Sequence, residues 1–354
     1  GAAIDKRTFG LQYIRVKECW IGQNASSGDA SGGTVIMLNT RGLIVDVSQL
    51  PYECVFTSAA GNKAVSLPVS PTSPSELLCV APDWGRKNTA TTTTMTLFNR
   101  VRNLIVPFEG AQGSNTFAFT ASWFQVQQKH IPASGGVLAI IGFGLHHTAP
   151  YRCWLEADVQ VGSPHVPRMI SNPERTTSAS TVSCNIPAWG HYYQAATVNV
   201  TLMDAHGLHV FFSGSPSLRE VEVRESWLSL QPATFLASSS VTISVRGFGF
   251  HSQRSYTCRL TWKAESFWST QYKVAEWNTE DSYSIEEISS APTAPEDQRT
   301  LICQLSAWGT QYAARTAILS VVSADISAGE VIFIGQAAAS NVDIHPTWSS
   351  ITPG

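Results

Sequence analysis

A short signature occurs three times along this chain: a cysteine, with Trp-Gly at the fifth and sixth positions after it. The copies are Cys79–Gly85, Cys184–Gly190 and Cys303–Gly309, which lie 105 and 119 residues apart. A motif that returns in this way indicates that one structural unit has been copied along the chain. Repetition also argues against an enzyme, because catalytic constellations rarely occur in triplicate within one chain.

Other landmarks keep the same order in every copy. The opening turns begin at Ala30, Ala133 and Ala237, the glycine turns are 41–43, 142–144 and 247–249, and the Tyr-x-Cys strands begin at Tyr52, Tyr151 and Tyr256. Short β-branched runs bounded by Gly, Pro, Ser or Asn, without long helical stripes, predict an all-β sandwich for each unit. The threonine-rich run 89–96 aligns with a strand of the other copies, so an exposed strand is expected there rather than an O-glycosylated tract.

The repeat divides the 354 residues into unit 1 (1–119), unit 2 (120–223) and unit 3 (224–344). Residues 345–354 repeat the opening of units 2 and 3. They are interpreted as the start of a further repeat or as a strand exchanged with a neighbouring molecule.

Unit 3 carries an insertion at 264–298 with acidic and aromatic residues. Its aromatic residues suggest a contact surface for a partner domain or a sugar; the alternative is an extra hairpin that covers its own sheet. The aromatic residues are Trp268, Tyr272, Trp277 and Tyr283.

Six of the seven cysteines form one pair per unit, with separations of 25, 31 and 45 residues. Such variable spacing fits a covalent link between two strands better than a metal site, whose ligands usually keep short fixed spacings. The predicted disulfides are Cys54–Cys79, Cys153–Cys184 and Cys258–Cys303, and the alternative is three pairs of buried thiols. Disulfides imply an oxidising, extracellular or cell-surface location. Cys19 is left over, as a free thiol, as the partner of another chain, or as the partner of a cysteine outside the given sequence.

The composition excludes some classes of function. The net charge is −3, so the chain lacks the basic footprint that nucleic acids require. No apolar stretch reaches eighteen residues, so no membrane span is predicted. Catalytic serine, zinc and phosphate-loop motifs are missing, and no catalytic, metal or cofactor site is expected.

Three kinds of residue have a structural or a ligand-binding interpretation. His146 and His147 are adjacent, and on a strand they would point to opposite faces, which disfavours a shared metal. One of them shares with His251 the position after the glycine turn, so loop positions are expected for these histidines. Each Trp of the signature is expected to pack over a sheet end, next to a glycine that permits a positive φ; the alternative is a ligand-binding Trp at the surface. Tyr193 and Tyr312 are expected to pack on the same corners. Asn24 and Asn199 begin possible N-glycosylation sequons.

The chain resembles the IPT/TIG domains of plexins and related receptors. The resemblance is carried by the Ser-Gly-Gly-Thr-Val-Ile opening at 31–36, the Gly-Phe-Gly turns, the Tyr-x-Cys strands and the closing 351–354. It implies three tandem immunoglobulin-like β-sandwiches that serve as spacer, adhesion or interaction modules, without catalytic residues. Unit 1 has Thr40-Arg41-Gly42 in place of Gly-Phe-Gly, which puts the conformation of its turn in doubt.

These features predict a non-enzymatic structural glycoprotein of an extracellular filament, surface appendage or coat. Copies of the chain would assemble head to tail, a contact that generates open filaments. The alternative is the stalk or ligand-binding ectodomain of a cell-surface receptor or adhesin, for which the insertion in unit 3 is the best support.

Overall fold

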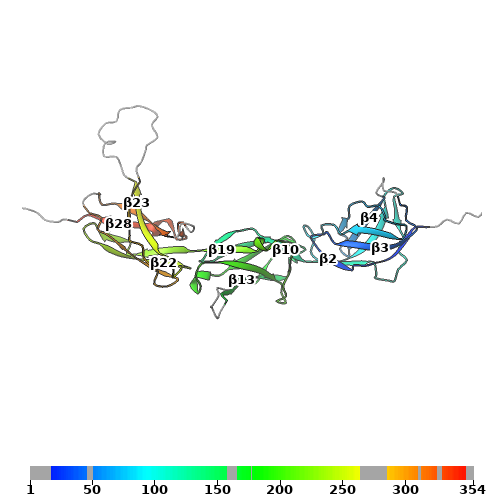
Figure 1. Ribbon diagram of the computed structural model, residues 1–354, viewed down its shortest axis with the longest axis horizontal. Coiled ribbons are helices and arrows are strands. Elements are labelled where there is room, and N and C mark those ends of the chain that lie inside the picture. The colour runs from blue at the N-terminus through cyan, green and yellow to red at the C-terminus, as the bar shows by residue number, and fades with distance from the viewer. Residues whose placement is uncertain are drawn as a thin grey trace, which may run out of the picture.

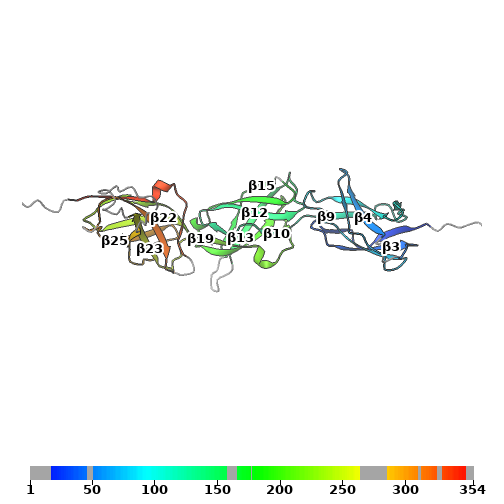
Figure 2. The ribbon, with the colours of Figure 1, turned by 90° about the horizontal axis from the view of Figure 1, so that it is seen from above.

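The computed structural model describes residues 17–45, 51–157, 166–176, 178–263, 285–309, 312–324 and 329–347. They form three tandem immunoglobulin-like β-sandwiches, each with two sheets and its own hydrophobic core. The units lie in a row, with the chain entering unit 1 at one tip and leaving unit 3 at the other (Figure 1, Figure 2). Among the described residues, no helix has the length and apolar character needed to cross a membrane.

The described part of unit 1 contains nine strands. They are β1 (Cys19–Gln23), β2 (Ser27–Asp29), β3 (Val35–Arg41), β4 (Tyr52–Ser58), β5 (Lys63–Val65), β6 (Glu76–Val80), β7 (Thr92–Asn99), β8 (Leu104–Val106) and β9 (Thr116–Thr120). One sheet has the order β1-β3-β6 and the other β2-β9-β7-β4-β5, with β8 paired to β7. The strand predicted in the threonine-rich run is confirmed as β7, although it is only half exposed because Thr93 and Met95 face the core.

Unit 2 repeats this plan. Its elements are β10 (Ser122–Val126), β11 (His130–Pro132), β12 (Gly136–Phe143), β13 (Pro150–Ala157), β14 (Arg168–Ile170), β15 (Glu174–Arg175), β16 (Thr181–Ile186), the 3₁₀ turn η1 (Trp189–His191), β17 (Ala196–Met203), β18 (Phe211–Phe212), η2 (Pro216–Leu218) and β19 (Glu220–Arg224). The sheets have the orders β16-β12-β10-β18 and β11-β19-β17-β13-β14, with β15 paired to β13.

Unit 3 has the same two sheets. Its elements are β20 (Ser226–Gln231), β21 (Thr234–Leu236), β22 (Val241–Phe248), β23 (Tyr256–Lys263), β24 (Ile285–Ser289), β25 (Thr300–Leu305), β26 (Thr316–Ser323), β27 (Ile332–Phe333), η3 (Ala337–Ser340) and β28 (Asn341–His345). The sheets have the orders β25-β22-β20-β27 and β21-β28-β26-β23-β24.

The first strand of every unit changes sheets. β1, β10 and β20 pair antiparallel with the next long strand, and each has a bulge just after its tryptophan, at Trp20, Trp123 or Trp227. The strand that follows, β2, β11 or β21, runs parallel to the last strand of the opposite sheet. The last strand leads within two residues into the first strand of the next unit, so the units are joined without a long linker.

A disulfide joins the two sheets of each unit, as the cysteine spacing predicts. The bonds are Cys54–Cys79, Cys153–Cys184 and Cys258–Cys303, with Cα–Cα distances of 6.3, 5.9 and 6.0 Å. Strand alternation places one side chain in two on the core side, and all six half-cystines are fully buried.

The signature tryptophans are buried at one end of each sandwich. Each indole N–H donates to the backbone carbonyl five residues later: Trp84 to Thr89 at 2.9 Å, Trp189 to Gln194 at 2.8 Å and Trp308 to Ala313 at 3.2 Å. Tyr193 and Tyr312 pack against these rings, with centroids at 4.9 and 5.5 Å, as predicted. The tryptophans therefore have the structural role, and the surface ligand-binding interpretation is wrong.

Candidate assembly site at the joints between units

Units 1 and 2 meet through a pair of backbone hydrogen bonds on one glycine. The N–H of Gly144, in the turn after β12, donates to the carbonyl of Gly85 at 2.9 Å. The carbonyl of Gly144 accepts the N–H of Ala90 at 2.8 Å. One residue of unit 2 is thus held between two backbone groups of the Trp84 corner, an arrangement we call the glycine clamp.

The glycine clamp recurs between units 2 and 3. The N–H of Gly249 donates to the carbonyl of Gly190 at 3.3 Å, and the N–H of Ala195 donates to the carbonyl of Gly249 at 2.8 Å. The three residues occupy the same positions in the repeat as those of the first clamp, so the joint is part of what has been copied.

Only glycine fits the corner side of the clamp. A Cβ added to Gly85 would lie 2.6 Å from Phe143 Cβ, and one added to Gly190 would lie 2.6 Å from the carbonyl carbon of Phe248. A side chain there would hold the two units apart. The expectation that these glycines permit a positive φ is wrong for Gly85 and Gly190, which lie outside the left-handed region, and holds only for Gly309, with φ +81°.

On the other side of the clamp lies the glycine of the turn after β12 or β22, which we call the clamp turn. This glycine is left-handed and closely packed. Gly144 has φ +69° and Gly249 has φ +77°, a conformation that favours glycine. A Cβ on Gly144 would lie 2.7 Å from Ala30 Cβ, and a Cβ on Gly249 would lie 2.7 Å from Ala133 Cβ.

A phenylalanine precedes each clamped glycine and crosses the boundary. Phe143 of unit 2 packs against the core of unit 1, and Phe248 of unit 3 packs against the core of unit 2. The joint therefore combines two directional bonds with buried apolar surface, which together favour one relative orientation of the units.

The clamp turn has the same support in all three units. The residue after the glycine is buried, and a tyrosine hydroxyl accepts the following backbone N–H: Tyr52 from Ile44 at 2.9 Å, Tyr151 from His146 at 2.9 Å and Tyr256 from His251 at 2.8 Å. Gly42 has φ +70°, as in the other two turns. The doubt about the turn of unit 1 is thereby removed, because Arg41 changes the side chain and leaves the backbone turn in place.

The polar contacts beside the two clamps differ. In the first joint the hydroxyl of Ser122 hydrogen bonds to the carboxylate of Asp29. In the second joint the hydroxyl of Ser226, which has the same place in the repeat, accepts the N–H of Ser134 at 3.2 Å.

Among the described residues at the two joints, Glu225 is the one buried carboxylate. Glu225 lies at the boundary, accepts the Tyr256 hydroxyl at 2.6 Å and pairs with Arg254 at 3.2 Å. Burial raises the pKa of Tyr256, and the neighbouring Glu225 raises it further. The first joint has Ala121 at this position.

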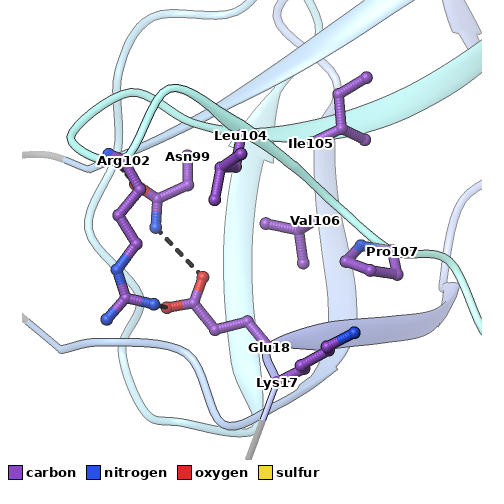
Figure 3. Close-up of a pocket in the computed structure, with 8 residues that line it drawn as sticks. All are labelled: Lys17, Glu18, Asn99, Arg102, Leu104, Ile105, Val106 and Pro107. Atoms are coloured by element: carbon purple, nitrogen blue, oxygen red, sulfur yellow. Dashed lines mark hydrogen bonds and ion pairs between the residues drawn. The ribbon is translucent and has the colours of Figure 1, made fainter. Parts of the chain in front are cut away.

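The tip of unit 1 that lies away from unit 2 resembles the unit 3 side of the second joint. A cavity of about 260 Å³ opens there (Figure 3). Glu18, at the position of Glu225, pairs with Arg102 at 2.9 Å and accepts the Asn99 amide at 3.1 Å. The cavity is lined by Lys17, Glu18, Asn99, Arg102 and the segment 104–107.

Cys19 is an unpaired, buried cysteine at the same tip. Burial raises the pKa of its thiol, and so do the hydrogen bond with Glu109 and the charge of that residue. Its place in the repeat is that of Ser122 and Ser226, the two hydroxyls that reach across the internal joints.

The remaining predicted residues do not gather into a site. His146 and His147 lie in the loop after the clamp turn, as their position in the repeat predicts. They are therefore not separated by the two faces of a strand, and their rings stack with centroids 5.6 Å apart. Within the described residues, no three His, Cys, Asp or Glu side chains could share a metal ion. Asn24 is exposed and its side chain accepts the Met37 N–H at 2.8 Å, while Asn199 is half-buried in β17. Trp268, Tyr272, Trp277 and Tyr283 lie outside the described residues.

A second aromatic repeat was missed in the sequence. Trp20, Trp123 and Trp227 pack against Phe108, Phe212 and Phe333, with ring centroids 4.5, 4.5 and 4.4 Å apart. Each of these phenylalanines is followed two positions later by a glycine, and this Phe-x-Gly spacing could have revealed the pairing.

No protein-family model and no curated protein matches this sequence. Similar solved structures include the full extracellular region of plexin A4, at 12% identity and a TM-score of 0.25, with 96% of this chain and 26% of the plexin chain covered. The chain thus spans about a quarter of that structure. Others are the tetra-tandem repeat in the extending region of a large adhesion protein (9% identity, TM-score 0.24, coverages 89% and 72%) and the chicken CNTN1 FN1–FN3 domains (12%, 0.24, 92% and 97%).

At TM-scores this low the likenesses support no conclusion about ligands or partners. The fold rests on the sheets of this chain, and the three inter-sheet disulfides point to an extracellular or secreted protein.

Proposed function

We propose that this chain is a non-enzymatic structural protein whose IPT/TIG-type units form a rod segment of an extracellular filament, surface appendage or coat, built by head-to-tail assembly of copies. The observation that carries the proposal is the glycine clamp, used twice with the same backbone partners. A linker that only connected independent binding domains would not require glycine on both sides of each joint.

Two further features support a mechanical role. Each sandwich has an inter-sheet disulfide, so both of its layers remain covalently connected under tension. The units follow one another in a row with the chain entering and leaving at opposite tips (Figure 2), so force applied at the tips acts along the row. A head-to-tail contact between such tips relates each copy to the next by a fixed rotation. If repeating this rotation does not bring the copies back to the start, the contact builds an open filament and not a closed ring.

Assembly of the full chain tests this proposal. Sedimentation velocity over a concentration series, with electron microscopy of the most concentrated sample, is expected to show linear oligomers that lengthen as concentration rises. A monodisperse monomer without fibres at high concentration would contradict it and would favour the stalk or ectodomain of a receptor or adhesin.

A further inference from the structure

The two tips of the row each carry one half of a glycine clamp. Gly309, at the Trp308 corner of unit 3, is exposed, and so is Gly42, in the turn of unit 1. Their counterparts within the chain are buried: Gly85, Gly190, Gly144 and Gly249. One tip therefore presents a corner and the other presents a turn.

We infer that a second copy of this chain docks by seating its turn Arg41–Leu43 on the Trp308–Gly309 corner. The inference rests on the function proposed above and names the contact through which the copies join. In this contact the N–H of Gly42 donates to the carbonyl of Gly309, and the carbonyl of Gly42 accepts the N–H of Ala314. Both bonds repeat those of the internal joints.

The corner of unit 3 has the required groups available. The hydrogen bond that holds the corner within its own unit is present, because the N–H of Gly309 donates to the carbonyl of Ala237 at 3.1 Å. The N–H of Gly190 donates to the carbonyl of Ala133 in the same way, at 2.8 Å. In the described part of the chain, the Gly309 carbonyl and the Ala314 N–H have no hydrogen-bond partner. Gly309 alone among the three corner glycines is left-handed, so docking includes a change of its backbone to the conformation of the occupied corners.

The turn of unit 1 is held ready in the docked form. Gly42 has the φ of the clamped glycines, and Leu43 is buried behind it with its N–H bonded to the carbonyl of Pro74 at 3.2 Å. The corresponding bond of Leu145 in unit 2 goes to Ala179 at 2.9 Å. The turn therefore needs no rearrangement to enter a corner.

A second pair of residues favours a copy of this chain as the occupant. In the first internal joint the carboxylate of Asp29 meets the hydroxyl of Ser122. The same two positions at the tips are Leu236, which is 51% exposed, and Cys19. Leu236 thus stands in place of Asp29, and Cys19 in place of Ser122. Because both partners change together, the contact between copies buries no polar atom without a partner.

Arg41 is the point at which the tip of unit 1 departs from the internal turns. It stands where Phe143 and Phe248 pack into the preceding core. The contact between copies consequently lacks one apolar insertion and is weaker than the internal joints, which suits a reversible assembly.

Substitutions in the full chain test the contact by sedimentation velocity. Gly309→Asn and Gly42→Asn each place a side chain between the two backbones, while asparagine tolerates the left-handed conformation that both glycines have. Each is expected to weaken association at least tenfold. Gly207→Asn is the matched control, because Gly207 has φ +76° and open space around it but lies in unit 2, away from both tips. Circular dichroism melting checks that every variant folds.

Arg41→Phe supplies the missing insertion and is expected to tighten association about tenfold, a gain that Gly309→Asn in the same chain removes. Association that survives both asparagine variants, and is lost when residues 348–354 are deleted, would show strand exchange. That result would overturn the inference and leave the proposed function standing. Wild-type and Arg41→Phe chains that both remain monomeric would overturn the two together.

Cross-linking provides a second, position-specific readout. Leu236→Cys is expected to form disulfide-linked oligomers through Cys19 of the next copy under mild oxidation, because the equivalent side chains are hydrogen bonded in the first joint. Adding Cys19→Ser should abolish these products. Cross-links that persist in that double variant would contradict the docking geometry.

Discussion

The interior of each unit and its end use repeated residues for different purposes. Inside, the disulfide and the buried tryptophan have the same environment in all three copies. At the end, the glycine of the same signature is buried in units 1 and 2 but exposed in unit 3. The cysteine and the tryptophan thus serve the unit that contains them, whereas the glycine serves the unit that follows.

This difference separates the stability of a sandwich from the rigidity of the row. Substitutions in the interior should unfold one unit. Substitutions at a clamp should leave every unit folded and release its neighbour.

The largest effect is expected for the interior. Removing the disulfide of unit 2 by Cys153→Ala with Cys184→Ala should lower the unfolding free energy of that unit by about 3 kcal/mol, because the bridge closes a loop in the unfolded chain. Urea denaturation followed by hydrogen exchange with mass spectrometry resolves which unit is affected. Equal loss of protection in units 1 and 3 would mean that the units do not unfold separately.

A clamp variant tests the other half of the comparison. Gly190→Val should break the two hydrogen bonds of the second joint, which lowers the free energy that holds units 2 and 3 together by about 2 kcal/mol. The unfolding free energy of unit 2 itself should stay unchanged. Nitrogen-15 relaxation should then show unit 3 tumbling faster than units 1 and 2. The matched control is Gly136→Val, where an added Cβ meets only Pro132 Cδ, at 3.9 Å. Unchanged tumbling in Gly190→Val would show that the clamp does not fix the units.

The buried carboxylate beside the second joint should stabilise the unit that contains it. Glu225→Gln removes the charge that pairs with Arg254 and accepts from Tyr256, and both partners lie in unit 3, so the unfolding free energy of unit 3 should fall by about 1.5 kcal/mol. Urea denaturation followed by hydrogen exchange with mass spectrometry measures the effect, and Ala121→Gln, at the equivalent position before unit 2, provides the comparison. An equal loss of stability in unit 1 would contradict the local role of this carboxylate.

The smallest effect is a pH dependence of unit 1. Burial raises the pKa of Tyr52 to about 12, and nearby Glu18 adds to the shift. A tyrosine that binds its proton more tightly in the folded state stabilises the fold fully below the ordinary pKa of about 10 and loses that contribution as pH rises to about 12. The unfolding free energy of unit 1, measured with urea, should therefore fall as the pH rises from about 10 to about 12. Tyr52→Phe should make this free energy less dependent on pH. A stability that rises over this range would contradict the assignment.

Much of the interior could be predicted from the sequence, because it depends on residues whose chemistry is local. Variable spacing identified the pairs that begin at Cys54, Cys153 and Cys258 as disulfides, and the position of Tyr193 after Trp189 predicted their packing. The order of landmarks was enough to predict three sandwiches.

The joints could not be predicted in this way, because the partner of each clamp glycine lies in another unit. Gly85 and Gly144 are far apart in the sequence, and a glycine that admits a neighbouring backbone looks the same as one that permits a turn. The loop position of His146 and His147 was predictable, because it follows from their place after the glycine turn in the repeat.

Small-angle X-ray scattering of the full chain tests most directly whether the glycine clamps hold the three units as one rod. We predict that the wild-type profile fits a single extended conformation. The profile of Gly85→Val with Gly190→Val should require an ensemble with a smaller mean radius of gyration, while circular dichroism stays unchanged. Identical profiles for the two proteins, or a wild-type chain that already requires a broad ensemble, would contradict the account.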